Sequence, residues 1–278
     1  MLLLLIIIAV LVLVSYLLRD ERLEVNYYRI TTNKIKQAFT IIQLSDLHST
    51  SFGKEQRELL TAIKNEQPDL IVMSGDIFEE NKPLVNCENL FKKITNLAPT
   101  YYVAGNHEYR DNDIERLFKL LEKYNIIRLV DENKQVTIKD NTINIAGLDD
   151  EEGNHYWQRS ETKLERLNKI TYNDNYFSIL LSHHPELVSL YKQSNYDLIF
   201  CGHAHGGQFR FNKGKKGLFA PQQGLFPKYT KGIYQLNDQV KMLVSGGLVV
   251  NRKPRINNRP DLVVITIEGD EELVKKED

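Results

Sequence analysis

Short apolar runs that end in polar or glycine-containing turns restrict the fold of this sequence more than any other feature. The runs are rich in Ile, Val, Leu and Tyr, which is typical of strands buried in a sheet. Leucines at helical spacing lie between the early runs, around residues 59–63 and 117–124. Alternating strands and helices predict an α/β fold. The predicted strands are residues 41–44, 70–73, 101–103, 143–146, 177–181, 198–200, 242–244 and 262–267.

The composition excludes several classes of protein. Of 278 residues, 42% are apolar and 26% are charged, which rules out a disordered or collagen-like chain. The sequence has 36 Lys and Arg residues and 37 Asp and Glu residues, so no overall positive charge favours binding to nucleic acid. Cys87 and Cys201 are the only cysteines, so a disulfide framework and a cysteine-type zinc site are also excluded.

The N-terminus predicts a membrane anchor. Residues 1–18 are almost wholly apolar, and as a helix they would extend about 27 Å, close to the thickness of a bilayer core. A cleaved signal peptide is the alternative, but no Lys or Arg precedes the run and no small-x-small cleavage site follows it. We therefore expect a single-pass anchor at 1–18, a juxtamembrane segment at 19–37 and one domain at 38–278.

Basic residues on the C-terminal side of the anchor bear on its orientation in the cell membrane. The positive-inside rule places the catalytic domain on the cytoplasmic side. An N-terminal apolar segment often directs the downstream domain across the membrane, so the opposite orientation stays open. The basic residues are Arg19, Arg22, Arg29, Lys34 and Lys36.

The histidines gather at the ends of the predicted strands. Only His155 lies elsewhere. In open α/β sheets ligands bind at the carboxyl ends of the strands, and carboxylate and amide groups accompany the histidines there. The polar residues at these ends are Asp46, His48, Asp76, Asn106, His107, His183, His184, His203 and His205.

Two pairs of these residues have a spacing of two. Asp46 and His48 form one pair, and His203 and His205 form the other. In an extended segment, residues i and i+2 project to the same side. We therefore expect each pair to aim two ligands at one point.

Imidazole, carboxylate and carboxamide groups together suit Zn, Mn, Fe or Co better than Ca. Seven candidate donors exceed what one tetrahedral ion needs, but they suit two divalent ions that share a bridging carboxylate. Such a centre stays net positive, which favours a phosphate anion. Two ions can clamp a phosphoryl group and acidify the attacking water.

The ordered motifs resemble those of the calcineurin-like metallophosphoesterase family over residues 38–268. They are Asp46-Leu-His48, Gly75-Asp76, Gly105-Asn106-His107-Glu108, His183 and Gly202-His203-Ala204-His205. The longer stretch 202–208, the tail 251–260 and the N-terminal apolar run resemble the membrane-anchored phosphodiesterase branch of the YkuE and YaeI proteins. The resemblance implies a four-layer α/β/β/α sandwich, here behind an N-terminal transmembrane helix.

The resemblance also implies a role for each matching residue. Asp46, His48 and His205 would hold the first metal ion. Asn106, His183 and His203 would hold the second, and Asp76 would bridge both. His183 is chosen over His184 because the family places its ligand two residues before a proline, here Pro185. His107 would not bind metal but would contact the phosphate and stabilise or protonate the leaving oxygen.

The resulting hypothesis is a dinuclear phosphoesterase of the phosphodiesterase type. A metal-bound hydroxide would attack a phosphodiester or pyrophosphate bond. The anchor favours a lipid-linked substrate, and a soluble nucleotide-containing substrate is the main rival. The basic stretch Arg252 to Arg259 could contact an anionic substrate or form a solvated face.

Three other functions remain as alternatives. A non-catalytic metal-binding module would keep the ligands without turnover, but the presence of His107 argues against it. A nuclease is disfavoured by the near-zero net charge. A protein phosphatase would need a peptide groove that the short loops near the motifs do not visibly build. The sequence leaves the oligomeric state open.

Overall fold

The structure, a computed structural model, describes residues 20–211, 216–250 and 255–270. All eight predicted strands are confirmed within these residues. The predicted anchor at 1–18 lies outside the described residues. Within them, no helix is long and apolar enough to cross a bilayer.

The first of two six-stranded sheets is mostly parallel and has the order β1-β16-β2-β3-β4-β5. Only β16 and β2 pair in antiparallel register. Ile, Val and Leu fill its central strands, which are buried on both faces as a covered parallel sheet requires. Its strands are β1 (Glu24–Thr32), β16 (Asp261–Gly269), β2 (Phe39–Leu44), β3 (Leu70–Ser74), β4 (Thr100–Val103) and β5 (Ile127–Arg128).

The second sheet has the order β14-β15-β9-β8-β7-β6. Its four central strands are parallel, and an antiparallel strand closes each edge. The strands are β14 (Gly232–Gln235), β15 (Lys241–Val244), β9 (Leu198–Cys201), β8 (Phe177–Ser182), β7 (Asn141–Leu148) and β6 (Glu132–Ile138). Two short hairpins stand apart from both sheets, namely β10 (Arg210–Phe211) with β11 (Lys216–Gly217) and β12 (Phe219–Ala220) with β13 (Gly224–Leu225).

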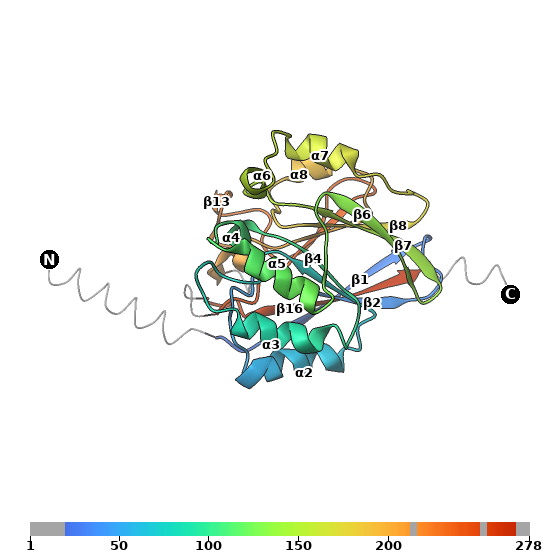
Figure 1. Cartoon of the computed structure of the whole chain (residues 1–278). Coiled ribbons are helices and arrows are strands. Elements are labelled where there is room, and N and C mark those ends of the chain that lie inside the picture. The colour runs from blue at the N-terminus through green and yellow to red at the C-terminus, as the bar shows by residue number, and fades with distance from the viewer. Residues whose placement is uncertain (1–19, 212–215, 251–254, 271–278) are drawn as a thin grey trace, which may run out of the picture.

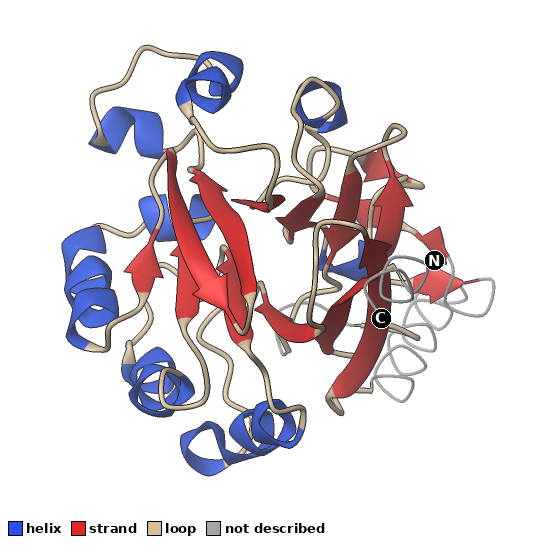
Figure 2. Cartoon of the chain, turned by 90° about the vertical axis from the view of Figure 1, so that its right-hand side faces the viewer, coloured by secondary structure: helices blue, strands red, loops and turns tan. Residues whose placement is uncertain are grey.

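The two sheets face each other and helices cover their outer faces (Figure 2). A core of residues from both sheets fills the space between them. A second core lies between the first sheet and α2, α3 and α5, and a third lies under α7 and α8 (Figure 1). The helices are α2 (Arg57–Asn65), α3 (Val85–Ile94), α4 (Asn106–Tyr109), α5 (Ile114–Lys123), α6 (Gly153–Tyr156), α7 (Lys163–Lys169) and α8 (Val188–Tyr191), with 3₁₀ turns η1 (Lys54–Gln56) and η2 (His205–Gly207).

The segment expected to be juxtamembrane, residues 19–37, contains a strand of the first sheet. All nine residues of β1 pair in parallel with β16, from Glu24 opposite Asp261 to Thr32 opposite Gly269. The expectation was wrong for these residues because β1 alternates polar and apolar side chains, as an edge strand does, and carries no continuous apolar run. The folded part therefore begins well before residue 38.

Hydrogen bonds between buried groups join the two sheets where the polar motifs begin. Nε2 of Gln43, at the end of β2, donates to the carbonyl of Cys201 at the end of β9 and to Oγ of Ser74 at the end of β3, each over 2.8 Å. The backbone N–H of His203 donates to Oδ1 of Asp46 over 2.9 Å. The loops that follow β2, β3 and β9 therefore meet at one edge of the sandwich.

Candidate metal centre

The structure brings six of the seven predicted ligands into two buried groups. In each group the candidate ligand atoms lie within 4.8 Å of one another. The first group is Asp46, His48 and His205, and the second is Asp76, His183 and His203. His107 forms a further candidate group with His48 and Asp76, and another with Glu79 and Glu80.

Asp76 links the two groups. Its Oδ2 lies 3.1 Å from Nε2 of His183 in the second group and 3.6 Å from Nε2 of His48 in the first. Its side chain is only 1% exposed. A buried carboxylate between two imidazoles has the position that a bridging ligand needs.

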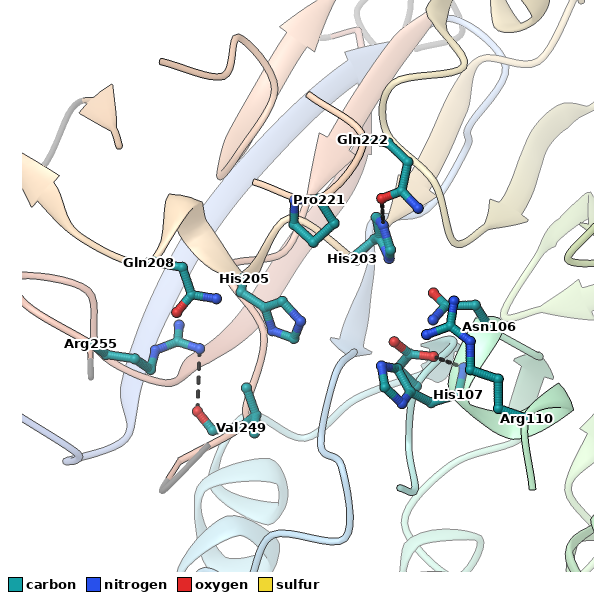
Figure 3. A pocket seen from close by; sticks show the side chains of 11 residues that line it. Asn106, His107, Arg110, His203, His205, Gln208, Pro221, Gln222, Val249 and Arg255 are labelled. Atoms are coloured by element: carbon teal, nitrogen blue, oxygen red, sulfur yellow. Dashed lines mark hydrogen bonds between the residues drawn. The ribbon is translucent and has the colours of Figure 1, made fainter. Parts of the chain in front are cut away.

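Asn106, the seventh predicted ligand, lines the same cavity as Asp76, His203 and His205 (Figure 3). It begins α4, directly after β4. Its side-chain Oδ1 is buried and has no hydrogen-bond partner among the described residues. Because a buried carbonyl oxygen without a partner is costly, this atom is suited to receive a cation.

The outer hydrogen bonds of His183 and His203 determine which ring nitrogens face inward. Nδ1 of His183 lies 2.8 Å from the carbonyl oxygen of Ser74, which can only accept, so this nitrogen carries the proton. Nε2 of His203 contacts Oε1 of Gln222 in the same way. The inward nitrogens, Nε2 of His183 and Nδ1 of His203, then face each other over 3.2 Å.

In the first group, His48 also contacts an outer acceptor with one ring nitrogen and faces inward with the other. Its Nδ1 lies 2.9 Å from Oε2 of Glu79, and its Nε2 faces Asp76. Carboxylate and carbonyl acceptors of this kind fix the tautomer and the orientation of metal-binding histidines.

These contacts test whether a metal ion fits. Two imidazole lone pairs and a carboxylate oxygen converge around His183, and no donor lies among them when the rings are neutral. Such a set is repulsive unless a proton or a metal ion lies between them. The donors are nitrogen and oxygen atoms, which suit divalent transition metals. The residues present therefore fit a divalent metal ion.

The pKa shifts of the buried histidines also agree with a site that fits a divalent metal ion. Burial alone would lower the pKa of His183, but Asp76 and Asp46 raise it to about 10, so these carboxylates favour a positive charge at this ring. Burial lowers the pKa of His203 to about 3 and that of His205 well below its ordinary value. Both of these rings are therefore neutral at pH 7, in the form that binds metal.

The pKa values of Asp46 and Asp76 shift in opposite directions. Burial raises the pKa of Asp46. Burial has the same effect on Asp76, but His183 and His48 together hold its pKa well below the ordinary value. Asp76 is therefore ionised at neutral pH and is available to a cation.

The backbone of five predicted ligands is left-handed, with φ between 46° and 65°. This conformation is uncommon for residues with a side chain and costs about 1–3 kcal/mol each where it is imposed. The predicted extended geometry is therefore wrong, since these residues lie in tight loops. Asp46 and His48 still converge, but His203 and His205 separate into different groups. The five residues are Asp46, His48, Asp76, His203 and His205.

Glycines allow the loops to approach one another. Gly75 has φ +88°, and a Cβ atom there would lie 2.5 Å from Nδ1 of His183. A Cβ on Gly105 would lie 2.4 Å from Oδ1 of Asp76. Because these separations are far below van der Waals contact, only glycine permits this packing around Asp76 and His183.

Glu108 holds two of the loops together and was not assigned a role from the sequence. Its buried carboxylate accepts hydrogen bonds from the backbone N–H groups of Gly105, Asp76 and Ile77 over 2.7–2.9 Å. Burial and the charge of Asp76 raise its pKa to about 8, and the backbone donors oppose that shift. Glu108 thus fixes the loop after β3 against the loop after β4.

His107 lies at the cavity wall and differs from the ligands in its partner. Its Nδ1 contacts the carboxylate of Glu80, and its ring centroid lies 4.7 Å from that of His48. Figure 3 shows the ring beside Arg110, whose guanidinium also faces the cavity. Arg110 pairs with Glu152, with Nε 2.8 Å from Oε2.

The sequence did not reveal Glu79, Glu80, Arg110, Gln208 or Gln222. Each lies in a loop whose role depends on how distant segments fold together. Arg110 follows Asn106 by four residues, and Gln208 ends the stretch 202–208 that carries part of the resemblance, but neither was given a role. The other three have no comparable signal in the sequence.

The basic stretch Arg252 to Arg259 contributes structure where it is described. Residues 252–254 lie outside the described residues. Arg255 lines the cavity, but its buried guanidinium donates to the carbonyls of Asn258, Val249, Gly246 and Arg259. These bonds occupy its donors, so Arg255 supports the loop rather than offering a charge to a ligand.

The two remaining histidines are not among the predicted ligands, although His184 forms a further candidate group with Glu186 and His203. Nε2 of His184 lies 2.6 Å from Oδ2 of Asp150, and Nδ1 lies 2.7 Å from Oε1 of Glu186. Both of its nitrogens are therefore engaged, although its ring packs beside His203. His155 lies in α6.

Comparison with known proteins identifies the same family as the motifs. The sequence profile of the calcineurin-like phosphoesterase family matches residues 39–207. An uncharacterized metallophosphoesterase of Campylobacter jejuni is 33% identical over 81% of this chain, which spans 57% of that protein's length. The uncharacterized protein YpbG of Bacillus subtilis is 26% identical over 91% of this chain and 90% of its own length. The uncharacterized metallophosphoesterase YkuE of Bacillus subtilis is 26% identical over 83% of this chain and 79% of its own length.

The profile covers β2 to η2, and so contains every loop that carries a predicted ligand. The family implies divalent metal ions, which fit the donor set described above. The chain therefore belongs to the calcineurin-like phosphoesterase family and is a metal-dependent hydrolase of phosphoric esters.

Proposed function

We propose that the chain is a dinuclear phosphodiesterase whose centre holds two divalent ions. Asp46, His48 and His205 would hold one ion, while Asn106, His183 and His203 would hold the other. The observation that carries the proposal is the position of Asp76, whose Oδ2 is shared between His48 and His183 at 3.6 and 3.1 Å.

The bound ions would supply Lewis-acid activation of the phosphoryl group and of the attacking water. The side chains would orient the substrate. Arg110 faces the cavity with its guanidinium held by Glu152, a geometry suited to a phosphoryl oxygen. Glu80 orients the ring of His107 through Nδ1, and we assign to His107 the transfer of a proton to the leaving oxygen.

We propose a phosphodiester or pyrophosphate as the substrate, carried on a lipid or containing a nucleotide. Polar side chains such as Asn106, His107 and Arg110 line the cavity, so it suits a phosphate group while the remainder of the substrate extends outward. The N-terminal apolar run supports a membrane-anchored enzyme of the YkuE and YaeI type. Such an enzyme would meet lipid-linked substrates at the surface of the cell membrane, and we favour the cytoplasmic side.

Hydrolysis by the full chain with Mn²⁺ tests this proposal. We expect an aryl phosphodiester and a nucleotide pyrophosphate to be hydrolysed faster than an aryl phosphomonoester. A lipid-linked diphosphate in vesicles extends the series. A preference for monoesters would contradict the assignment. Turnover of none of these substrates, with metal bound, would instead support a non-catalytic module.

A further inference from the structure

An exposed apolar surface lies on the two hairpins next to the catalytic cavity. Four large apolar side chains are exposed there, and we call them the apolar patch: Phe211, Phe219, Leu225 and Phe226. Leu225 and Phe226 are 67% and 69% exposed. The rings of Phe211 and Phe226 pack edge to face with their centroids 6.3 Å apart. A contiguous exposed apolar surface of this kind marks an interaction site.

Two lysines line the cleft beside the apolar patch. Lys216 and Lys228 line a cleft together with Phe211 and Phe226. The sequence has no Asp or Glu from Leu198 to Asn237. Exposed aromatic and leucine side chains beside lysines complement the interface of an anionic phospholipid bilayer.

The patch also lies near Glu24, close to the first described residues of the chain. Glu24 pairs with Lys231 over 2.9 Å, next to Thr230, which lines the cleft. In Figure 1, β13 lies at the upper left of the molecule, and the blue ribbon of the first described residues begins at the lower left. The nineteen residues before Asp20 are outside the described residues, and their sequence is almost wholly apolar.

The hairpin that carries the patch also reaches the metal centre. Pro221 and Gln222, at the turn between β12 and β13, line the catalytic cavity, and Gln222 contacts His203. Leu225 and Phe226 follow within four residues of Gln222. A surface that contacts the patch therefore lies beside the mouth of the cavity.

We propose that the apolar patch docks on an anionic phospholipid bilayer. Leu225 and Phe226 enter the boundary between headgroups and acyl chains, while Lys216 and Lys228 contact the headgroup phosphates. The proposal goes beyond the proposed function, because it requires neither the metal ions nor a particular substrate. It predicts that the open side of the catalytic cavity faces the lipid surface.

A fluorescent label at position 225 of the full chain tests the proposal. A Leu225→Cys variant is labelled with an environment-sensitive dye and mixed with vesicles of phosphatidylglycerol and phosphatidylcholine, some carrying nitroxide on the acyl chains. Cys87 and Cys201 are buried and do not compete for the label. A Glu122→Cys variant on α5 is the matched exposed control.

We expect the label at 225 to shift to the blue and to be quenched by the nitroxide lipid, and the label at 122 to do neither. The double change Lys216→Gln and Lys228→Gln should weaken quenching at 225, with each lysine worth about fivefold in binding. Because the label reports local depth, attachment through residues 1–18 alone leaves position 225 unquenched, which would overturn the proposal. A blue shift that grows with protein concentration without vesicles would show self-association and would overturn it as well.

Discussion

Nδ1 of His203 lies 3.2 Å from Nε2 of His183, while the other ring nitrogen of each histidine contacts an oxygen acceptor. The two inward nitrogens come from different loops, after β9 and after β8. A proton or a metal ion between them relieves the repulsion of their lone pairs. The acceptors behind the rings are therefore as much a part of the proposed centre as the ligands.

Gln222→Ala should weaken metal binding, because Gln222 holds the tautomer and orientation of His203. Loss of an outer partner of this kind typically costs about 10- to 100-fold in metal affinity. Chelator competition measures the change. Gln235→Ala, at an exposed position in β14, is the control and should retain the affinity of the unchanged chain. Equal affinities for both variants would remove Gln222 from the site.

His107→Ala should lower the rate of hydrolysis by about 10²- to 10⁴-fold while both metal ions stay bound. The reason is that His107 is assigned to the leaving group rather than to the metal. Metal content and turnover of an aryl phosphodiester are measured on the same sample. His155→Ala, in α6, should change neither quantity. Loss of metal in the His107 variant would make His107 a ligand and our assignment wrong.

Gly75→Ala should disrupt the site, because its Cβ would lie 2.5 Å from Nδ1 of His183. Gly224→Ala is a matched control, since Gly224 also has a positive φ but has nothing within 4 Å of its Cβ. The control should lose only about 1 kcal/mol of stability from backbone strain. Thermal unfolding and metal titration should show a larger loss of stability and weaker metal binding for Gly75→Ala alone.

Cys87 should be unreactive in the folded protein. Burial raises the pKa of its thiol to about 12, so at pH 8 only about 1 in 10,000 thiols is ionised. A thiol reagent should modify Cys87 only after denaturation. The raised pKa also links stability to pH: the contribution of this thiol is present below its ordinary pKa of 9.0 and is lost as the pH rises towards 12. Rapid modification of the native chain at pH 8 would contradict the buried position.

The sequence was sufficient to predict eight buried strands and the strand-end motifs, because most of these strands are continuous apolar runs. It did not reveal β1, whose polar and apolar residues alternate at an edge, or α3, whose helical pattern was not recognised. The predicted ligands were found through motifs. The spacing of His203 and His205, however, led to the wrong expectation that their rings point at one place. Their left-handed backbone turns the two rings towards different groups.

The residues that support the ligands could not be predicted from the sequence, for a physical reason. Glu79, Glu80 and Gln222 act through contacts between loops that are distant in sequence. Gln222 lies on a hairpin with no motif, and its relation to His203 arises only when β12 and β13 fold over the loop after β9. Such contacts depend on tertiary structure and leave no local pattern.

The metal content of the full chain and of its Asp76→Ala variant tests the central claim most directly. After loading with Mn²⁺ and removal of free metal, elemental analysis should find about two ions per unchanged chain, consistent with a clamp of two metals. The variant, which lacks the shared carboxylate, should retain fewer than one ion and almost no phosphodiesterase activity. Two ions in the variant, or undiminished hydrolysis by the unchanged chain in excess chelator, would contradict a dinuclear centre built around Asp76.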